Sequence, residues 1–262
     1  RIGRVAVDIL TGLKNVRFSY TENNGTFLPG FIPEYGFLGQ TSFSGSLAPT
    51  FGFVFGSQSD ILNKAIENGW LLSRDSNEAY YAMNYSKSHF DKFDYSATVQ
   101  FTRNLDIELF GNRTYTESFN QQLDVINGAL NDTPKNGVGN FSISQVMLGT
   151  SLQDSDELFQ TFKDNRSIIS SRLADESGAD INGFGSTNQD VVLPAFLAAY
   201  TGKSAEGVQL TAFRNTPVPN WRISYKGLMQ ISFMKENFRS FTLEHSYRSV
   251  YSVLSFTNNL RY

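Results

Sequence analysis

The stretch "SFTLEHSYRSVYSV", from Ser240 to Val253, decides the fold because its apolar and polar residues alternate. Successive side chains of a β-strand point to opposite faces of a sheet, so an alternating strand has one apolar and one polar face. The apolar face would carry Phe241, Leu243, Tyr247, Tyr251 and Val253, with His245 among them. The polar face would carry Thr242, Glu244, Ser246, Arg248 and Ser252. The segment therefore predicts strand structure between two different environments.

The same alternation recurs along the chain. "FDYSATVQF" (93–101) and "LDIELF" (105–110), separated by "TRN", predict a hairpin with a tight turn. "NVRFSYTE" (15–22) and "APTFGFVFGS" (48–57) also alternate, the second with Phe51, Phe53 and Phe55 on one face. Further strands are expected at about 2–10, 78–87, 139–149, 208–214 and 220–226. The chain is therefore predicted to be all-β.

Three segments have helical periodicity instead. "SQSDILNKAIENGW" (57–70) pairs Ser57 with Asp60 as a capping box and has Gly69 as a stop signal. "DSDELFQTFKDNRSIISSRLA" (154–174) and "DVVLPAFLAAYTG" (190–202) predict two more helices, the latter with Pro194 in its first turn. We expect one domain over residues 1–262, with loop or helix insertions at about 57–72, 119–138 and 150–205.

Composition excludes several classes of function. The net charge is -3 and the pI is about 5.5, so the chain lacks the basic footprint of a nucleic-acid binder. It contains no cysteine, which rules out disulfides and thiolate metal sites. Its longest apolar run, "VVLPAFLAAY" (191–200), is too short for a transmembrane helix. Because the chain opens "RIGRVAV", without Met or a signal region, we expect a mature or internal segment.

No catalytic, cofactor-binding or metal-binding residue is predicted, and the chain is not expected to be an enzyme or to carry a cofactor. The two histidines, His89 and His245, have no neighbouring His or Cys that would form a zinc site. The acids at 154, 156 and 157 fit a helix start. The glycines of "GVGNFS" and "GFGSTN" lack the third Gly of a phosphate-binding fingerprint.

The aromatic faces require either a protein core or lipid, since exposed aromatic strands aggregate in water. The uneven connections, minimal at "TRN" and long at 119–140 and 150–205, favour a transmembrane β-barrel over a soluble sandwich. The candidate lipid-facing or interfacial wall residues are Phe51, Phe53, Phe55, Trp221, Phe241, Leu243, Tyr247 and Tyr251. The candidate lumen-facing residues are Glu244 and Arg248.

Several long segments of the sequence resemble one protein family. They are "LKNVRFSYTENNGTFLPGF" (13–31), "APTFGFVFGSQSDI" (48–61), "ELFGNRTYTESF" (108–119), "TPVPNWRISYKGL" (216–228) and "FTLEHSYRSVYSVLSFTNNL" (241–260). In this order they resemble the SprA/Sov family, giant outer-membrane proteins of Bacteroidetes. The resemblance begins near Leu13 and is weaker at about 29–40 and 150–207.

This resemblance implies a translocon of the type IX secretion system, a protein-conducting channel of the bacterial outer membrane. Such a channel exports folded sorting-domain cargo, including gliding-motility adhesins at the cell surface. The chain would be an arc of a very large antiparallel transmembrane β-barrel, with around ten strands at about 9–11 residues each. The implied partners are the remaining strands of its own long chain, a PorV-like lateral barrel partner that collects cargo, a periplasmic plug protein, the secreted cargo and membrane lipid.

Two alternatives remain open at the level of sequence. A TonB-dependent receptor or porin-like channel would show the same alternation and a chain ending on an aromatic, as in "NNLRY". A soluble extracellular glycan-binding β-sandwich would use Trp70, Trp221 and exposed Tyr residues as stacking platforms.

Overall fold

The structure, a computed structural model, describes residues 12–57, 59–81, 83–131, 133–178, 180–211 and 213–258, except the side chains of Asn182 and Asn258. It is mostly β-sheet, with one large antiparallel sheet and few helices, which confirms the all-β prediction. The strand expected at 2–10 lies outside the described residues.

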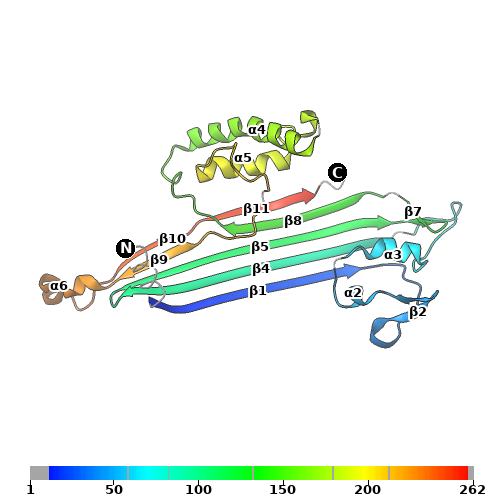
Figure 1. The fold of residues 1–262 in the computed structure, drawn as a ribbon, viewed down its shortest axis with the longest axis horizontal. Coiled ribbons are helices and arrows are strands. Elements are labelled where there is room, and N and C mark those ends of the chain that lie inside the picture. The colour runs from blue at the N-terminus through cyan, green and yellow to red at the C-terminus, as the bar shows by residue number, and fades with distance from the viewer. Residues whose placement is uncertain are drawn as a thin grey trace. The chain divides into compact units, whose positions relative to one another are not determined.

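Within the described residues, seven strands form the large sheet (Figure 1). They are β1 (Leu13–Phe27), β4 (Met83–Thr102), β5 (Leu105–Leu123), β8 (Lys135–Ser144), β9 (Asn220–Tyr225), β10 (Leu243–Tyr247) and β11 (Val250–Asn258). The strand order is β1-β4-β5-β8-β11, and β9 pairs with both β5 and β10. Two small hairpins join β2 (Thr41–Phe43) to β3 (Ser46–Ala48) and β6 (Val125–Ile126) to β7 (Ala129–Leu130).

The hairpin predicted around "TRN" is confirmed, because β4 ends at Thr102 and β5 begins at Leu105. These two strands have 20 and 19 residues. At about 3.3 Å per residue, such a strand is roughly twice as long as the ~30 Å hydrocarbon core of a bilayer. Within the described residues the large sheet has seven strands, against around ten expected, and each long strand uses more residues than a minimal membrane span.

The helices and 3₁₀ turns fill the connections between strands. The α-helices are α2 (Phe51–Val54), α3 (Ile61–Glu67), α4 (Ser155–Ser177), α5 (Gln189–Thr201) and α6 (Ser232–Asn237). The 3₁₀ turns are η1 (Phe37–Gly39), η2 (Ile181–Gly183) and η3 (Gly227–Gln230). None of the helices in the described ranges has the length and apolarity needed to cross a bilayer. The helices predicted within 154–174 and 190–202 are confirmed as α4 and α5.

Local capping explains where these helices begin and end. The Asp154 side chain accepts a hydrogen bond from the Asp156 N–H at the start of α4, and Asn188 does the same for Asp190 at the start of α5. Gly202 ends α5 in the left-handed conformation, with φ 67°. Pro194 lies inside α5, beyond its first turn.

The strand predicted over "APTFGFVFGS" is wrong, because residues Phe51–Val54 form helix α2. The Thr50 hydroxyl accepts a hydrogen bond from the Phe53 N–H and so begins a helical turn. Phe51 and Phe55 then stack one turn apart, with ring centroids 6.4 Å from each other. These phenylalanines are therefore not part of the sheet.

Four smaller predictions also need correction. Asp60, and not Ser57, caps α3, because its carboxylate accepts the Leu62 N–H. The strand expected at 78–87 begins only at Met83, and the one expected at 139–149 ends at Ser144. The described residues of 208–214 contain no strand.

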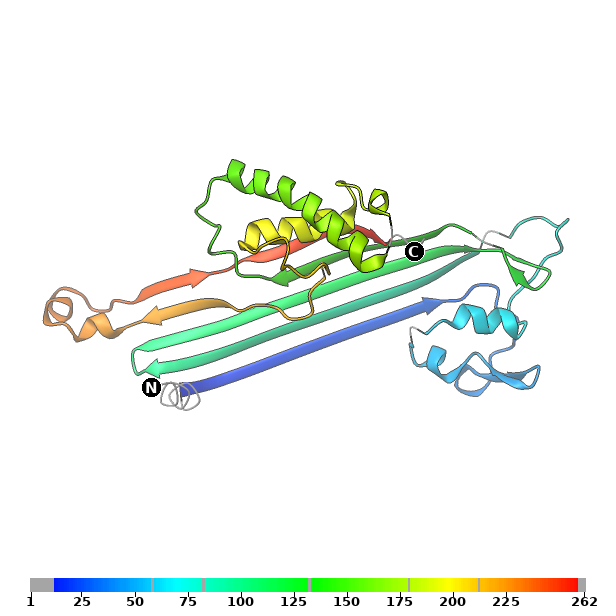
Figure 2. The same ribbon diagram turned by 45° about the horizontal axis from the view of Figure 1, so that its top comes forward.

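The chain divides into two compact units. The first comprises Arg1–Ser19, Phe93–Arg113 and Ser142–Ser252, and the second comprises Tyr20–Lys92, Thr114–Phe141 and Val253–Tyr262. In the first unit, α4 and α5 pack side by side (Figure 2) around Ile169, Val191 and Ala195. In the second unit, a separate core gathers around Trp70, Tyr85 and Leu123.

Candidate membrane-contact surface

One face of the first unit's sheet is continuously apolar across three strands. The antiparallel registers pair Leu105, Ile107 and Leu109 of β5 with Tyr225, Ile223 and Trp221 of β9. The same β9 residues pair with Leu243, His245 and Tyr247 of β10. Directly paired residues share a face of the sheet. We call these nine residues, Leu105, Ile107, Leu109, Trp221, Ile223, Tyr225, Leu243, His245 and Tyr247, the apolar band.

The intervening positions form a polar face on the other side of the same strands. The registers place together Asp106, Glu108, Arg222, Ser224, Glu244 and Ser246, and the last pair on this side is Phe110 with Asn220. Arg222 Nη1 lies 3.3 Å from Glu108 Oε2, and both side chains are largely exposed. This pair is a cross-strand contact of the kind that sheets tolerate on a solvated face.

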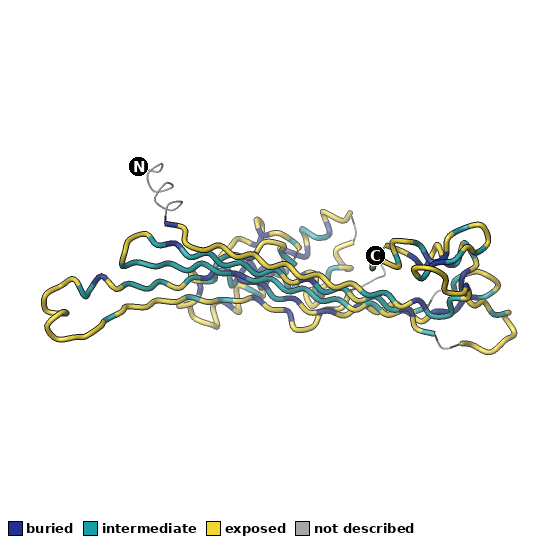
Figure 3. Tube along the Cα trace, turned by 90° about the horizontal axis from the view of Figure 1, so that it is seen from below, coloured by how far each residue is buried: buried dark blue, intermediate teal, exposed yellow. Residues whose placement is uncertain are grey.

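The rest of the described chain covers the apolar band only in part, because seven of its members are half-buried and Leu243 and His245 are exposed. None of its nine members is buried, and Leu243 is 54% exposed. In Figure 3 the strands are drawn mostly in teal and yellow, the colours of intermediate and exposed residues. A partly covered apolar surface that crosses several strands calls for an apolar neighbour, either protein or lipid.

Aromatic residues mark one end of the band. The Trp221 and Tyr247 rings stack with centroids 4.7 Å apart and an interplanar angle of 26°. The Tyr247 hydroxyl accepts a hydrogen bond from the Met147 N–H at 2.8 Å. These are amphipathic side chains with an apolar body and a polar tip, the type that is enriched where a membrane meets water.

A close contact extends the apolar side onto β4. A Cβ at Gly111 would lie 2.6 Å from Cε1 of Tyr95, so the Tyr95 ring rests on the glycine. Gly111 alternates in step with Leu109, which places Tyr95 on the side of the apolar band. The Tyr95 hydroxyl donates to the Pro217 carbonyl at 3.1 Å and fixes the ring. By alternation, the other predicted apolar residues of this strand share that side: Phe93, Ala97, Val99 and Phe101.

The structure separates seven of the eight predicted wall residues into three groups. Trp221, Leu243 and Tyr247 belong to the apolar band. Phe241 precedes β10 and packs edge-to-face on Phe238, with centroids 6.0 Å apart. The third group is formed by the three phenylalanines of "FGFVF" (51–55), which lie in or next to helix α2.

Tyr251 differs from the other predicted wall residues that lie on strands. It is only 4% exposed, and its ring lies 6.0 Å from that of Phe196 in α5. This chain therefore supplies its own cover over Tyr251. Of the two predicted lumen residues, Glu244 lies on the polar face, and Arg248 is exposed between β10 and β11.

Ile223 and Tyr225 are band residues beyond those expected from the sequence, although the alternation in "NWRISY" (220–225) indicates their side of the strand. Gly111 is a further residue on this side of the sheet, and its contact with Tyr95 on another strand leaves no signal in its own segment. Of the two tryptophans named as glycan-stacking platforms, Trp70 is only 1% exposed in the core of the second unit. Trp221 is half-buried and stacks on Tyr247.

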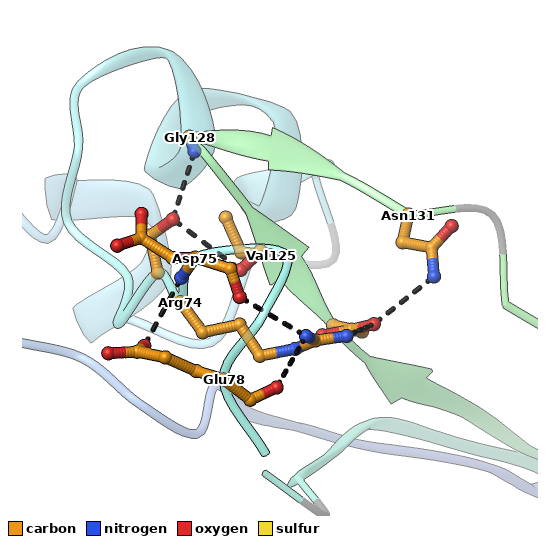
Figure 4. A network of polar contacts seen from close by, with 8 residues as sticks. Arg74, Asp75, Glu78, Val125, Gly128 and Asn131 are labelled. Carbon is orange, nitrogen blue, oxygen red and sulfur yellow. Dashed lines mark hydrogen bonds and ion pairs between the residues drawn. The ribbon is translucent and has the colours of Figure 1, made fainter. Parts of the chain in front are cut away.

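In the second unit, a network of hydrogen bonds holds the loop at residues 74–78 against Asp124 (Figure 4). The Arg74 guanidinium donates to both Asp124 oxygens, at 2.8 and 3.0 Å, and its Nη1 also donates to the Glu78 carbonyl. Asn131 adds a third donor to Asp124. The hydrogen bonds from Arg74 lower the pKa of Asp124 below its usual value, and those same bonds raise the pKa of Arg74. The network explains how this loop is held in place.

In the described ranges, no group of three or more His, Asp or Glu side chains could hold a metal ion. A scan of protein-family models finds no match to this chain, and a search of curated proteins finds none either. The apolar band and the quoted sequence segments are therefore the features of this chain that indicate a function.

Proposed function

We propose that this chain is an arc of the wall of a transmembrane β-barrel, with the apolar band against lipid and the polar face toward the lumen. The observation that carries the proposal is the three-strand register, which makes one face apolar and only partly covered and the other polar and charged. Transmembrane barrels alternate in this way, apolar outside and polar inside.

The height of the band also supports a membrane span. On β5 the apolar set begins at Leu105, next to the hairpin turn, and the same side of the strand carries Arg113 eight residues later. About 9–11 residues of a tilted strand suffice to cross a bilayer. The hydrocarbon layer would then meet only the half of β5 nearest the turn, and the remaining half would extend into water.

The particular barrel that we propose is the outer-membrane translocon of type IX secretion. Its support is the resemblance of five long segments, in order, to the SprA/Sov family. Such a channel performs no covalent chemistry, because its function is to enclose a path for folded sorting-domain cargo. Barrel closure by further strands would satisfy the backbone groups at the sheet edges, as the bilayer interior requires.

The test uses cells that produce the native protein. An epitope inserted after Leu152, which is 99% exposed in a connection, should leave the sheet intact. We expect a polypeptide much longer than 262 residues that stays in the outer membrane through an alkaline wash. Depletion of this protein should stop the export of sorting-domain cargo. A soluble product of 29.3 kDa would contradict both the membrane location and the translocon.

The apolar band equally favours a second function, a TonB-dependent receptor or porin-like channel, because any outer-membrane barrel needs such a surface. The depletion experiment separates the two. Loss of small-nutrient uptake with normal cargo export would replace the translocon by a passive or receptor channel, and it would leave the membrane assignment unchanged.

A further inference from the structure

Four polar residues of the second unit join strand β1 to strand β4. His89 Nδ1 of β4 lies 2.6 Å from the Asn24 side-chain oxygen of β1, and His89 Nε2 lies 3.2 Å from Asp91 Oδ2. Asn24 Nδ2 donates to Glu22 Oε1 at 2.8 Å. We call Glu22, Asn24, His89 and Asp91 the β1–β4 clamp.

The neighbours of Asn24 fix which way its amide points. An ionised carboxylate can only accept hydrogen bonds, so Glu22 requires the NH₂ group of Asn24. The Tyr20 hydroxyl donates to the other Glu22 oxygen at 2.9 Å. The carbonyl oxygen of Asn24 must therefore face His89, and both ring nitrogens of His89 face acceptors.

A neutral imidazole has one N–H, whereas an imidazolium has two. The geometry points to a proton-operated fastening: the β1–β4 clamp is complete only when His89 carries both ring protons, and loss of one proton loosens β1 from β4. Without that proton, one ring nitrogen faces an acceptor lone pair. Turning the Asn24 amide would relieve this contact only by breaking its bond to Glu22.

Charged groups on β1 and β4 and an aromatic ring on β5 lie around His89. Glu22 on β1 and Asp91 on β4 place two carboxylates beside it. On the β5 side, the Tyr115 ring centroid lies 5.9 Å away, and its hydroxyl donates to Glu117. Lys87 alternates onto the same side of β4, but its ammonium lies 5.7 Å from the Tyr85 ring centroid.

The position of the clamp gives it a role in the sheet. Among the described strands, β1 is at one end of the order β1-β4-β5-β8-β11. Its pairing with β4 therefore decides whether the last strand of this sheet stays attached. Imidazoles change charge between about pH 5 and 8. The pairing of β1 with β4 should therefore be most stable in mild acid and become less stable as the pH rises.

The test is hydrogen–deuterium exchange of the native protein, purified in detergent, at pH 5.5 and 8.5. After correction for intrinsic exchange, the backbone amides of residues 20–27 and 84–91 should lose about tenfold protection at the higher pH, the effect of one charge-assisted hydrogen bond. No change in protection between the two pH values would overturn the proposal.

Substitutions show whether His89 is the group that titrates. His89→Gln stays neutral and should abolish the pH response, whereas His245→Gln removes the other of the chain's two histidines and should preserve it. Glu22→Gln keeps His89 but lets the Asn24 amide turn, so the response should shrink even if His89→Gln fails to fold. A response that survives in both His89→Gln and Glu22→Gln, or disappears in His245→Gln, would contradict the clamp.

Discussion

Strands β10 and β11 follow one another in the chain and share one alternating sequence, yet their apolar faces meet different neighbours. On β10, Leu243 is 54% exposed and belongs to the apolar band. On β11, Tyr251 is 4% exposed beneath Phe196 of α5. The comparison teaches that alternation identifies an apolar face but does not identify what covers it.

The cover over β11 comes from an insertion and not from the sheet itself. α5 lies in the long connection between β8 and β9, and the Phe196 ring also stacks on Tyr200 of the same helix, with centroids 4.1 Å apart. The aromatic side of α5 thereby gives Tyr251 a protein neighbour. The band on β10 has no such helix in the described chain, and lipid is the neighbour that we propose for it.

The largest expected effect is on the covered strand. Tyr251→Ala should destabilise the first unit by about 3–5 kcal/mol, because a large buried ring is replaced by a cavity. Denaturant unfolding monitored by exchange of the α5 amides would measure the loss. Leu254→Ala is the control on the same strand, since Leu254 is 89% exposed and should change stability little. Similar losses in the two variants would remove the distinction between covered and uncovered positions.

An arginine on the apolar face of the uncovered strand β10 should lower stability only when the protein is in a membrane. Leu243→Arg should cost about 2–4 kcal/mol if the residue lies near the middle of the bilayer, whereas Glu244→Arg on the polar face should be mild. Denaturant titration of the protein folded into lipid vesicles measures both. Equal tolerance of arginine at the two positions would refute the assignment of the band to lipid.

A smaller loss of stability is expected from a substitution at the contact between β4 and β5. Gly111→Ala should destabilise the sheet by about 1–3 kcal/mol, because its Cβ would push against the Tyr95 ring. Gly149→Ala is the matched control, since nothing lies within 4 Å of a Cβ there. In the double variant with Tyr95→Ala, the added cost of Gly111→Ala should disappear. A cost that persists without the ring would exclude this contact as its cause.

The smallest effect concerns the polar face. Arg222→Ala should change stability by about 0–1 kcal/mol, because its ion pair with Glu108 is exposed on both sides. A double-mutant cycle with Glu108→Ala at low and high salt would measure the coupling, which should fall as salt rises. A coupling of several kcal/mol that salt does not change would mean that this face is not solvated.

Much of the fold was readable from local signals. The turn between Thr102 and Leu105 is short and flanked by alternating residues, and α4 and α5 carry a capping residue at the start and a left-handed glycine after the end. Each of these signals acts within a few residues. A strand was expected at the helix Phe51–Val54 because four residues are too few to separate a period of 2 from one helical turn.

The candidate surface was readable only in part. Alternation places Leu243 and Tyr247 on one side of their own strand, because strand geometry dictates which side chains of a strand share a side. That Trp221 lies on the same side depends on the register between β9 and β10. The contribution of Gly111, by contrast, depends on the ring of Tyr95 from a neighbouring strand.

The sequence by itself determined that this protein has strands with one apolar and one polar face, since alternation is a property of each strand's own backbone. Only the tertiary structure decided which parts of those faces are covered and which polar residues meet. Phe196 reaches Tyr251 through folding of an insertion, and His89 meets Asn24 across 65 residues of sequence. Such contacts depend on how separate elements pack, and that information is not contained in the periodicity of any one segment.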